Sequence, residues 1–155
     1  MMKGSKPANL FEKRALIFAN LFLIANKLQV ISDQYLTPSG LTAKQWFLIA
    51  AIQQFDTPPT LSEVSELSGS SRQNVKQLAI KLEKNDFLRI EKDAQDTRAV
   101  RLILTEKCRS FWERREMQDT QFITELFSCL GETETGILSE SVQKILKRVE
   151  EIVIH

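Results

Sequence analysis

The sequence predicts a mainly α-helical fold with one small β-hairpin. Residues 60–84 form two short amphipathic helical patterns with a tight break between them. Residues 87–104 read as two strands around a charged tip, and apolar-rich helical patterns lie on both sides of this region. Two helices, a tight turn and a hairpin in this order are typical of a winged helix-turn-helix, joined here to an α-helical dimerisation region.

Composition fits a soluble globular chain with a locally basic segment. The 155 residues are 43% hydrophobic and 26% charged, with a net charge of +1. Residues 71–105 hold eight basic and five acidic side chains, whereas residues 106–155 hold seven basic and ten acidic ones. A basic excess of this kind is what a DNA-binding surface needs, although a chance fluctuation gives the same count.

Catalytic and metal-binding patterns are missing from the sequence. Cys108 and Cys129 are too far apart for a metal-ligand pair, and His155 is the last residue. There is no glycine-rich phosphate loop and no nucleophile with an arranging base. We therefore expect no metal, no cofactor and no enzymatic activity, and the cysteine usage favours a reducing, cytoplasmic location.

The N-terminal part predicts one long, unusually apolar helix. Residues 1–9 read as a loose tail, and a helical pattern runs from Leu10 to about Tyr35. Lys13 and Arg14 precede eleven largely apolar residues, which raises the possibility of a signal peptide, but Asn20 interrupts the run. The run is also shorter than the ~20 apolar residues of a membrane span, so we expect no membrane contact. Both sides of the helix are apolar, which indicates burial against a partner chain.

Two further helices follow a break at residues 37–40. Thr42 is a good N-cap for a helix to about residue 55. Thr60 and Glu63 form a capping-box pattern that opens the next, short helix. The apolar side chains expected to face inward from this short helix are Leu61, Val64 and Leu67.

The next helix carries the clearest separation into two faces. Ser70 or Ser71 caps it after a turn at residues 68–70, and it runs to about Lys84. Its apolar stripe follows helical spacing and contains Val75, Leu78, Ala79 and Leu82. The opposite face is polar, basic and amide-rich, with Gln73, Lys76, Gln77, Ile80 and Lys84.

The hairpin and two long helices complete the chain. Asn85 and Asp86 end the preceding helix, since both tolerate a left-handed backbone. Strands are expected over residues 87–92 and 98–104 around a turn-rich tip, and helices over residues 106–130 and 132–152. The predicted organisation is a helical dimerisation region made of residues 10–36 and 106–152 and a DNA-binding domain made of residues 37–105.

This order of elements resembles the MarR family of bacterial transcriptional regulators, over about residues 10–150. Residues 61–69 are similar to the family's first helix and turn, residues 75–84 to its recognition helix, and residues 96–105 to its wing with an Asp-x-Arg and a closing Leu-Thr. Asp86 departs from the family pattern, which usually has glycine there, and the wing carries fewer arginines than is typical.

The resemblance implies that the polar helix face and the wing contact DNA. Gln73 and Gln77 suit an adenine edge, and arginine and lysine suit guanine or phosphate. Arg98 is expected to enter the minor groove with Asp96 orienting it. A solvated helix face and a simple turn ion pair are the competing interpretations. The candidate DNA-binding residues are Ser71, Arg72, Gln73, Asn74, Lys76, Gln77, Lys81, Lys92, Asp96 and Arg98.

The resemblance also suggests an effector crevice between the dimer helices and the DNA-binding lobe. A small aromatic or anionic effector is the expected class of ligand, and ordinary core packing is the competing interpretation. The candidate lining residues are Tyr35, Trp46, Phe111, Trp112 and Arg115.

The sequence thus predicts a homodimeric regulator that binds a pseudo-palindromic duplex operator. Repression, with release by a small ligand, is the commoner outcome in the family. The sequence leaves two alternatives open. One is a winged-helix protein–protein interaction module without a DNA target. The other is a thiol-based redox sensor acting through Cys108, which lies between Lys107 and Arg109 at the first turn of a helix.

Overall fold

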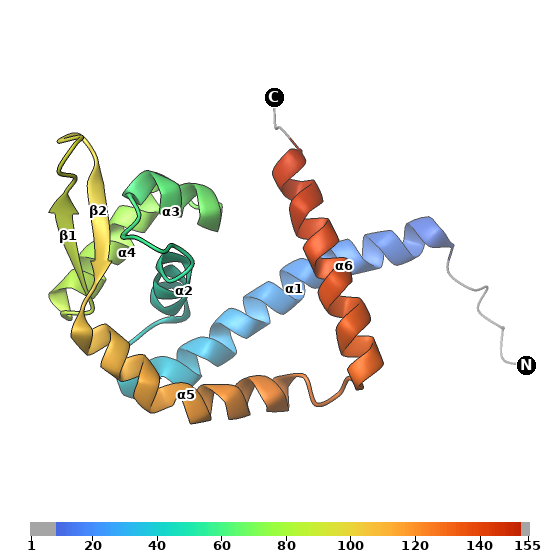
Figure 1. Ribbon diagram of the computed structural model, residues 1–155. Coiled ribbons are helices and arrows are strands. Elements are labelled where there is room, and N and C mark those ends of the chain that lie inside the picture. The colour runs from blue at the N-terminus through green and yellow to red at the C-terminus, as the bar shows by residue number, and fades with distance from the viewer. Residues whose placement is uncertain (1–8, 153–155) are drawn as a thin grey trace, which may run out of the picture. The chain divides into compact units, whose positions relative to one another are not determined.

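The computed structural model describes residues 9–152 and confirms the predicted mainly α fold with a two-stranded hairpin (Figure 1). Packing divides the chain into two compact units, one through Cys108 and one from Arg109. The elements are α1 Leu10–Leu36, η1 Thr37–Ser39, α2 Ala43–Ile52, α3 Leu61–Ser68, α4 Arg72–Lys84, β1 Leu88–Lys92, β2 Val100–Leu104, α5 Glu106–Leu126 and α6 Glu132–Glu151.

The helix starts follow local capping chemistry. The Thr42 hydroxyl accepts a hydrogen bond from the Gln45 backbone N–H, and the Gln45 side-chain oxygen accepts one from the Thr42 backbone N–H. Thr60 and Glu63 form the same reciprocal box ahead of α3, as predicted. Asn9 also caps α1 in this way, so the last residue of the predicted loose tail is ordered; the rest of that tail lies outside the described residues.

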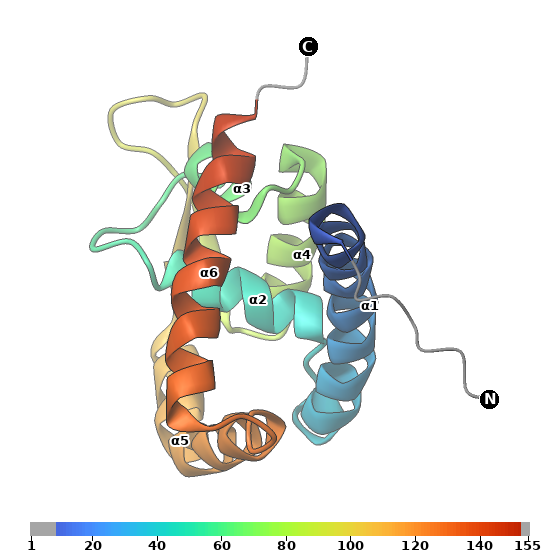
Figure 2. The ribbon, with the colours of Figure 1, turned by 90° about the vertical axis from the view of Figure 1, so that its right-hand side faces the viewer.

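The first unit packs α2, α3 and α4 around one apolar core. The hairpin lies alongside α4 (Figure 1), and α2 lies beside α1 (Figure 2). Leu67 is 51% exposed, so its predicted inward orientation is wrong; α3 is only eight residues long and turns its apolar side inward chiefly at Val64. The fully buried side chains of this core are Ile49, Val64, Val75, Ala79, Leu82, Leu88 and Leu102.

The two strands form one antiparallel ladder in which Leu88 pairs with Leu104 and Lys92 with Val100. The second strand begins two residues later than predicted. Residues 98 and 99 remain in the turn because the Ala99 N–H bonds the Asp96 carbonyl and the Asp93 N–H bonds the Ala99 carbonyl. These bonds close a tight loop at the wing tip before the ladder begins.

Asp86 adopts the left-handed backbone conformation that the sequence pattern suggested, with φ of 59°. The Asp86 N–H bonds the Glu83 carbonyl at 2.9 Å, which ends α4. Two partners hold the following backbone: Thr105 Oγ1 donates to the Asp86 carbonyl at 2.7 Å, and Lys107 Nζ donates to the Asn85 carbonyl at 2.6 Å. The fold thus imposes on a non-glycine residue a conformation that glycine adopts without strain.

Replacing Asp86 by glycine is therefore expected to stabilise the protein by about 0.5–1 kcal/mol, because it removes the side-chain strain while keeping the backbone hydrogen bonds. Urea unfolding monitored by circular dichroism measures this change. Asp86→Ala is the matched control, since alanine keeps the Cβ atom and loses only the polar group. An Asp86→Gly protein no more stable than the wild type would contradict the strain argument.

The second unit contains most of α5 and all of α6. Helix α5 ends at Leu126, four residues before the predicted end, because a turn closed by Ser128 N–H to the Glu125 carbonyl and Leu130 N–H to the Phe127 carbonyl follows it. Helix α6 carries exposed apolar residues at Leu138, Val142, Ile145 and Val149. Their alternating spacing of four and three residues is that of a seam between packed helices.

Helix α1 leaves a large apolar surface exposed. The segment Leu10–Ser39 is long and apolar enough, by length and composition, to cross a membrane, so the expectation that it is too short was wrong. That expectation counted a single apolar run, whereas the helix continues without a break to Leu36. The exposed apolar residues of α1 include Phe11, Leu16, Ile17, Phe18, Leu21, Phe22, Leu23, Ile24, Val30 and Ile31.

Candidate DNA-binding interface

Helix α4 separates a buried face from an exposed polar one. Val75, Ala79 and Leu82 are buried and Leu78 is partly buried, as the apolar stripe predicted. All the predicted contact residues on this helix are exposed: Arg72, Gln73, Asn74, Lys76, Gln77 and Lys81. Ile80, a large apolar residue, lies on the same exposed face. Amide, guanidinium and ammonium groups on one helix face can reach base edges and phosphates together.

The turn before α4 leaves the start of that helix open to solvent. Gly69 ends α3 with φ of 63°, and the Ser70 N–H bonds the Ser65 carbonyl at 3.1 Å. Ser71 rather than Ser70 is the N-cap, since its hydroxyl accepts from the Asn74 N–H at 3.2 Å. Ser71 remains exposed beside Arg72. The positive end of the helix dipole at this point favours a phosphate.

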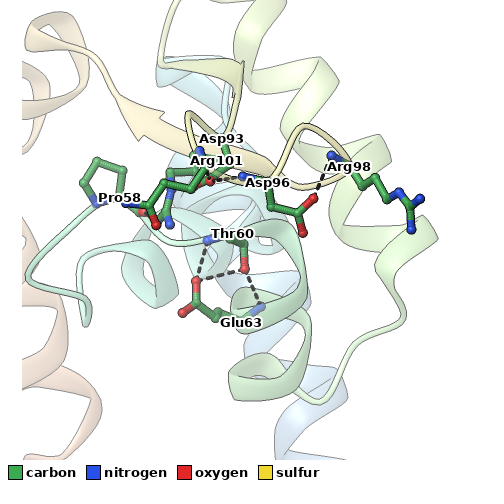
Figure 3. A network of polar contacts seen from close by, with 8 residues as sticks. Pro58, Thr60, Glu63, Asp93, Asp96, Arg98 and Arg101 are labelled. Atoms are coloured by element: carbon green, nitrogen blue, oxygen red, sulfur yellow. Dashed lines mark hydrogen bonds and ion pairs between the residues drawn. The ribbon is translucent and has the colours of Figure 1, made fainter.

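The wing tip presents Arg98 to solvent. The Asp96 carboxylate accepts a hydrogen bond from the Arg98 backbone N–H at 3.0 Å. The Arg98 guanidinium extends away from Asp96 in Figure 3. Asp96 therefore fixes the backbone of Arg98, as expected, but it does not contact the Arg98 guanidinium. Lys92, at the end of β1, is also exposed.

A buried carboxylate beneath the wing tip was missed by the sequence reasoning. Asp93 is 8% exposed, and its carboxylate accepts from the Gln95 and Asp96 backbone N–H groups, each at 2.8 Å. The same carboxylate forms an ion pair with the Arg101 guanidinium (Figure 3). An aspartate ahead of turn-forming residues is a recognisable signal for such side-chain-to-backbone bonds. No local pattern, however, pairs it with Arg101.

These contacts lower the pKa of Asp93 to about 2 from 3.8, chiefly through the Asp96 and Gln95 backbone N–H groups and then through Arg101. A carboxyl group whose pKa is lower in the folded protein than in the unfolded chain stabilises the folded state at pH values above its unfolded-state pKa. This stabilisation is lost as the pH falls through the folded-state pKa. We therefore expect Asp93→Asn to destabilise the protein near neutral pH. The difference from the wild type should narrow as the pH falls from 3.8 towards 2. Urea unfolding of both proteins across this range measures it, and a constant difference would contradict the pKa shift.

The first unit also contains an open cavity of about 320 Å³ next to the helix-turn-helix. Trp46 and Phe47 of α2 line it, together with Ser70, Asn74 and Leu78 around the start of α4. The remaining lining residues are Ala25, Leu28, Gln29, Ser32, Ala43 and Lys44. Trp46 is the one predicted effector residue in this lining; Tyr35, on the same unit, is not part of it.

The other predicted effector residues form a cluster on α5 in the second unit. The rings of Phe111 and Trp112 meet edge to face with centroids 5.6 Å apart. The Arg115 guanidinium lies 5.3 Å from the centroid of the Phe111 ring and pairs with Asp119 at 3.2 Å. The predicted set is thus divided between the two units.

The two thiols have opposite environments. Cys108 is fully buried, and its backbone N–H bonds Thr105 Oγ1 at the start of α5. Cys129 is exposed. Burial keeps peroxide from the Cys108 sulfur in the folded state and so disfavours the redox-sensor alternative. Within residues 9–152, no group of three or more His, Cys, Asp or Glu side chains is placed to hold a metal ion.

Comparison with solved structures decides the fold. A MarR/EmrR family regulator from Acinetobacter sp. ADP1 superimposes with a TM-score of 0.78 over 90% of this chain and 98% of its own, at 20% sequence identity. BldR from Sulfolobus solfataricus superimposes with a TM-score of 0.80 over 91% of this chain and 99% of its own, at 18% identity. The chain has the MarR fold.

Other similarities agree with the MarR fold. A mutant MarR from E. coli complexed with operator DNA superimposes with a TM-score of 0.76 over 90% of this chain and 99% of its own, at 18% identity. The transcriptional repressor MprA of Escherichia coli strain K12 is 32% identical over 91 residues, or 59% of this chain. The chain spans about half the length (52%) of this curated relative. No protein-family model matches the sequence.

Proposed function

We propose that the protein is a DNA-binding transcriptional regulator of the MarR type that acts as a homodimer, most simply as a repressor. The observation that carries the proposal is the exposed polar face of α4 together with an exposed arginine, Arg98, at the wing tip. Both are built on a MarR fold, and among proteins of that fold one solved example is complexed with operator DNA and another, MepR of S. aureus, is a DNA complex. MprA, the partial relative, is named as a transcriptional repressor.

Helix α4 is the part proposed to enter the major groove. Gln73 and Gln77 lie one turn apart on its exposed face, and each side chain both donates and accepts, as an adenine edge requires. Arg72 and Lys76 supply charge for guanine or phosphate. The wing carries Arg98 to the adjacent minor groove, where negative potential is concentrated.

The exposed apolar surfaces of α1 and α6 support the dimer. Each unit leaves one of these helices with large apolar side chains in water, which a second copy of the chain would cover. A two-fold dimer requires half-sites about one helical turn apart.

Effector control is the finer part of the proposal. The cavity beside Trp46 and Phe47 offers apolar walls, and Lys44 supplies a positive charge that suits a small aromatic anion. Its lining includes Ser70 and Asn74, so an occupant would touch the start of the recognition helix. A ligand changes DNA binding only through different affinities for the free and bound conformations. In a Trp112→Phe background, where Trp46 is the only tryptophan, quenching of its fluorescence by a panel of aromatic carboxylates tests the cavity, with Lys44→Ala as the control. No quenching by any compound would refute effector binding in this cavity.

Selection of bound duplexes from a random pool tests the DNA-binding proposal directly. The expected product is a pseudo-palindrome with half-sites about one helical turn apart. Running the same selection with Gln77→Ala is expected to relax preference at one position of each half-site and to leave overall affinity little changed. A uniform loss across all sequences would place Gln77 on the phosphate backbone instead.

Salt dependence separates the regulator from the protein–protein interaction module. A DNA-binding dimer releases several counterions, so the logarithm of its association constant should fall steeply with the logarithm of salt concentration. A chain that recovers no duplex and shows no salt-dependent binding to random DNA would overturn the proposed function and favour the interaction module.

A further inference from the structure

The base of the wing is tied to a segment far away in sequence. Arg101 Nη1 donates to the Pro58 carbonyl at 2.6 Å, across 43 positions of the chain. Beside this bond, the Leu102 N–H bonds the Pro59 carbonyl at 2.9 Å, and Thr60 forms an isolated antiparallel bridge with Arg101. Because Thr60 caps α3, these contacts connect the hairpin directly to the start of the helix-turn-helix.

The same guanidinium reaches the wing tip through Asp93. Arg101 Nε pairs with one carboxylate oxygen of Asp93, and the other oxygen holds the backbone N–H groups of Gln95 and Asp96. Asp96 in turn holds the backbone N–H of Arg98. Figure 3 shows this chain of contacts running from Pro58 to Arg98. Charge-assisted bonds of this kind are short and directional, and connected bonds strengthen one another.

The chemistry of Arg101 fits the task of joining two partners at once. Its planar guanidinium presents several donors in fixed directions, so Nε can donate to the Asp93 carboxylate while Nη1 donates to the Pro58 carbonyl. A lysine ammonium is a single point donor and cannot span both partners with this geometry. The Arg101 side chain is 38% exposed, so the contact is accessible to water and depends on correct geometry rather than on deep burial.

We infer that Arg101 and Asp93 are positioning residues that set the wing-tip Arg98 relative to the recognition helix, so that both reach the same operator half-site. This inference rests on the proposed function. Neither residue needs to touch DNA, because each acts through the backbone of residues 95–98. Removing the guanidinium breaks the side-chain link between Asp93 and the Pro58 carbonyl, so the wing tip keeps only its own turn bonds and the backbone bonds of the hairpin.

The first test uses the protein without DNA. Arg101→Met keeps much of the side-chain length and removes both polar contacts. Amide hydrogen exchange is expected to speed up at Gln95, Asp96 and Arg98 and to remain unchanged in the middle of α4. The matched control is Arg89→Met on the same hairpin, which removes only the exposed pair with Glu91. Unchanged exchange at the wing tip, or equal acceleration in α4, would overturn the inference whether or not the protein binds DNA.

The second test uses a double-mutant cycle on operator affinity. Arg101→Met is expected to weaken binding several-fold in the wild-type background and to have little further effect once Arg98 is alanine, since the wing arginine through which it acts is gone. Arg101→Lys should recover only part of the loss. A residue that merely stabilised the fold would give additive losses, which would refute the positioning role. Failure of the wild type to select any duplex would instead refute the proposed function.

Discussion

Ile145→Glu is expected to convert the proposed dimer to a monomer and to abolish tight operator binding. Ile145 is 41% exposed within the chain and lies in the middle of the apolar seam of α6. In a two-fold interface the substitution places two carboxylates among apolar side chains, where an unpaired buried charge costs several kcal/mol. A monomer keeps the contacts of one half-site only, so its affinity should fall by on the order of a thousandfold or more.

Lys147→Glu is the matched control for this change. The two positions lie about 160° apart around the helix, so the control introduces the same residue on the polar face of α6. Sedimentation equilibrium gives the oligomeric state and fluorescence anisotropy the operator affinity, while circular dichroism checks that helix content is kept. An Ile145→Glu protein that stays dimeric and binds its operator would exclude the α6 seam from the interface.

Arg98→Ala is expected to weaken operator binding by about 30-fold. An arginine in a narrow minor groove contributes at least about 1 kcal/mol per subunit, and a dimer loses two of them, with each 1.4 kcal/mol corresponding to a tenfold change. The loss should also reduce the dependence of binding on salt, because two cationic groups leave the interface.

Arg89→Ala supplies the comparison for the wing arginine. Arg89 is another exposed arginine of the hairpin and pairs at 3.5 Å with Glu91, so its loss removes the same charge away from the wing tip. Anisotropy titrations of the three proteins at two matched salt concentrations separate a specific minor-groove contact from a general charge effect. Equal losses of operator affinity in Arg98→Ala and Arg89→Ala would contradict a specific minor-groove contact by Arg98.

Local chemistry made the helices and the candidate DNA-binding face predictable. A capping box such as that of Thr60 and Glu63 satisfies the first N–H groups of a helix within four residues, so short-range pattern suffices to locate it. The two faces of α4 follow from helical spacing alone, which places Val75 and Gln77 on different sides. The left-handed backbone of Asp86 was also predictable, because Asn85 and Asp86 at the end of the helical pattern both tolerate that conformation.

Long-range contacts and surfaces without regular spacing were not predictable in this way. Arg101 donates a hydrogen bond to Pro58, which lies 43 positions away in the chain. The period-two pattern of the strand predicts only that Arg101 and Leu102 point to opposite faces of the hairpin. Leu67 fits an inward-facing helical pattern, but the short α3 leaves it in solvent. The cavity beside Trp46 is lined by residues of α1, α2 and α4, so the sequence of any one segment does not predict it.

The contrast between the two cysteines provides an internal probe of opening in the first unit. Thiol reagents added to the native protein should modify the exposed Cys129 at once. Cys108 is 0% exposed, so its sulfur becomes reactive only when the packing around the start of α5 opens. The slow labelling rate of Cys108 therefore reports the free energy of that opening, and operator DNA bound to the first unit should slow it further.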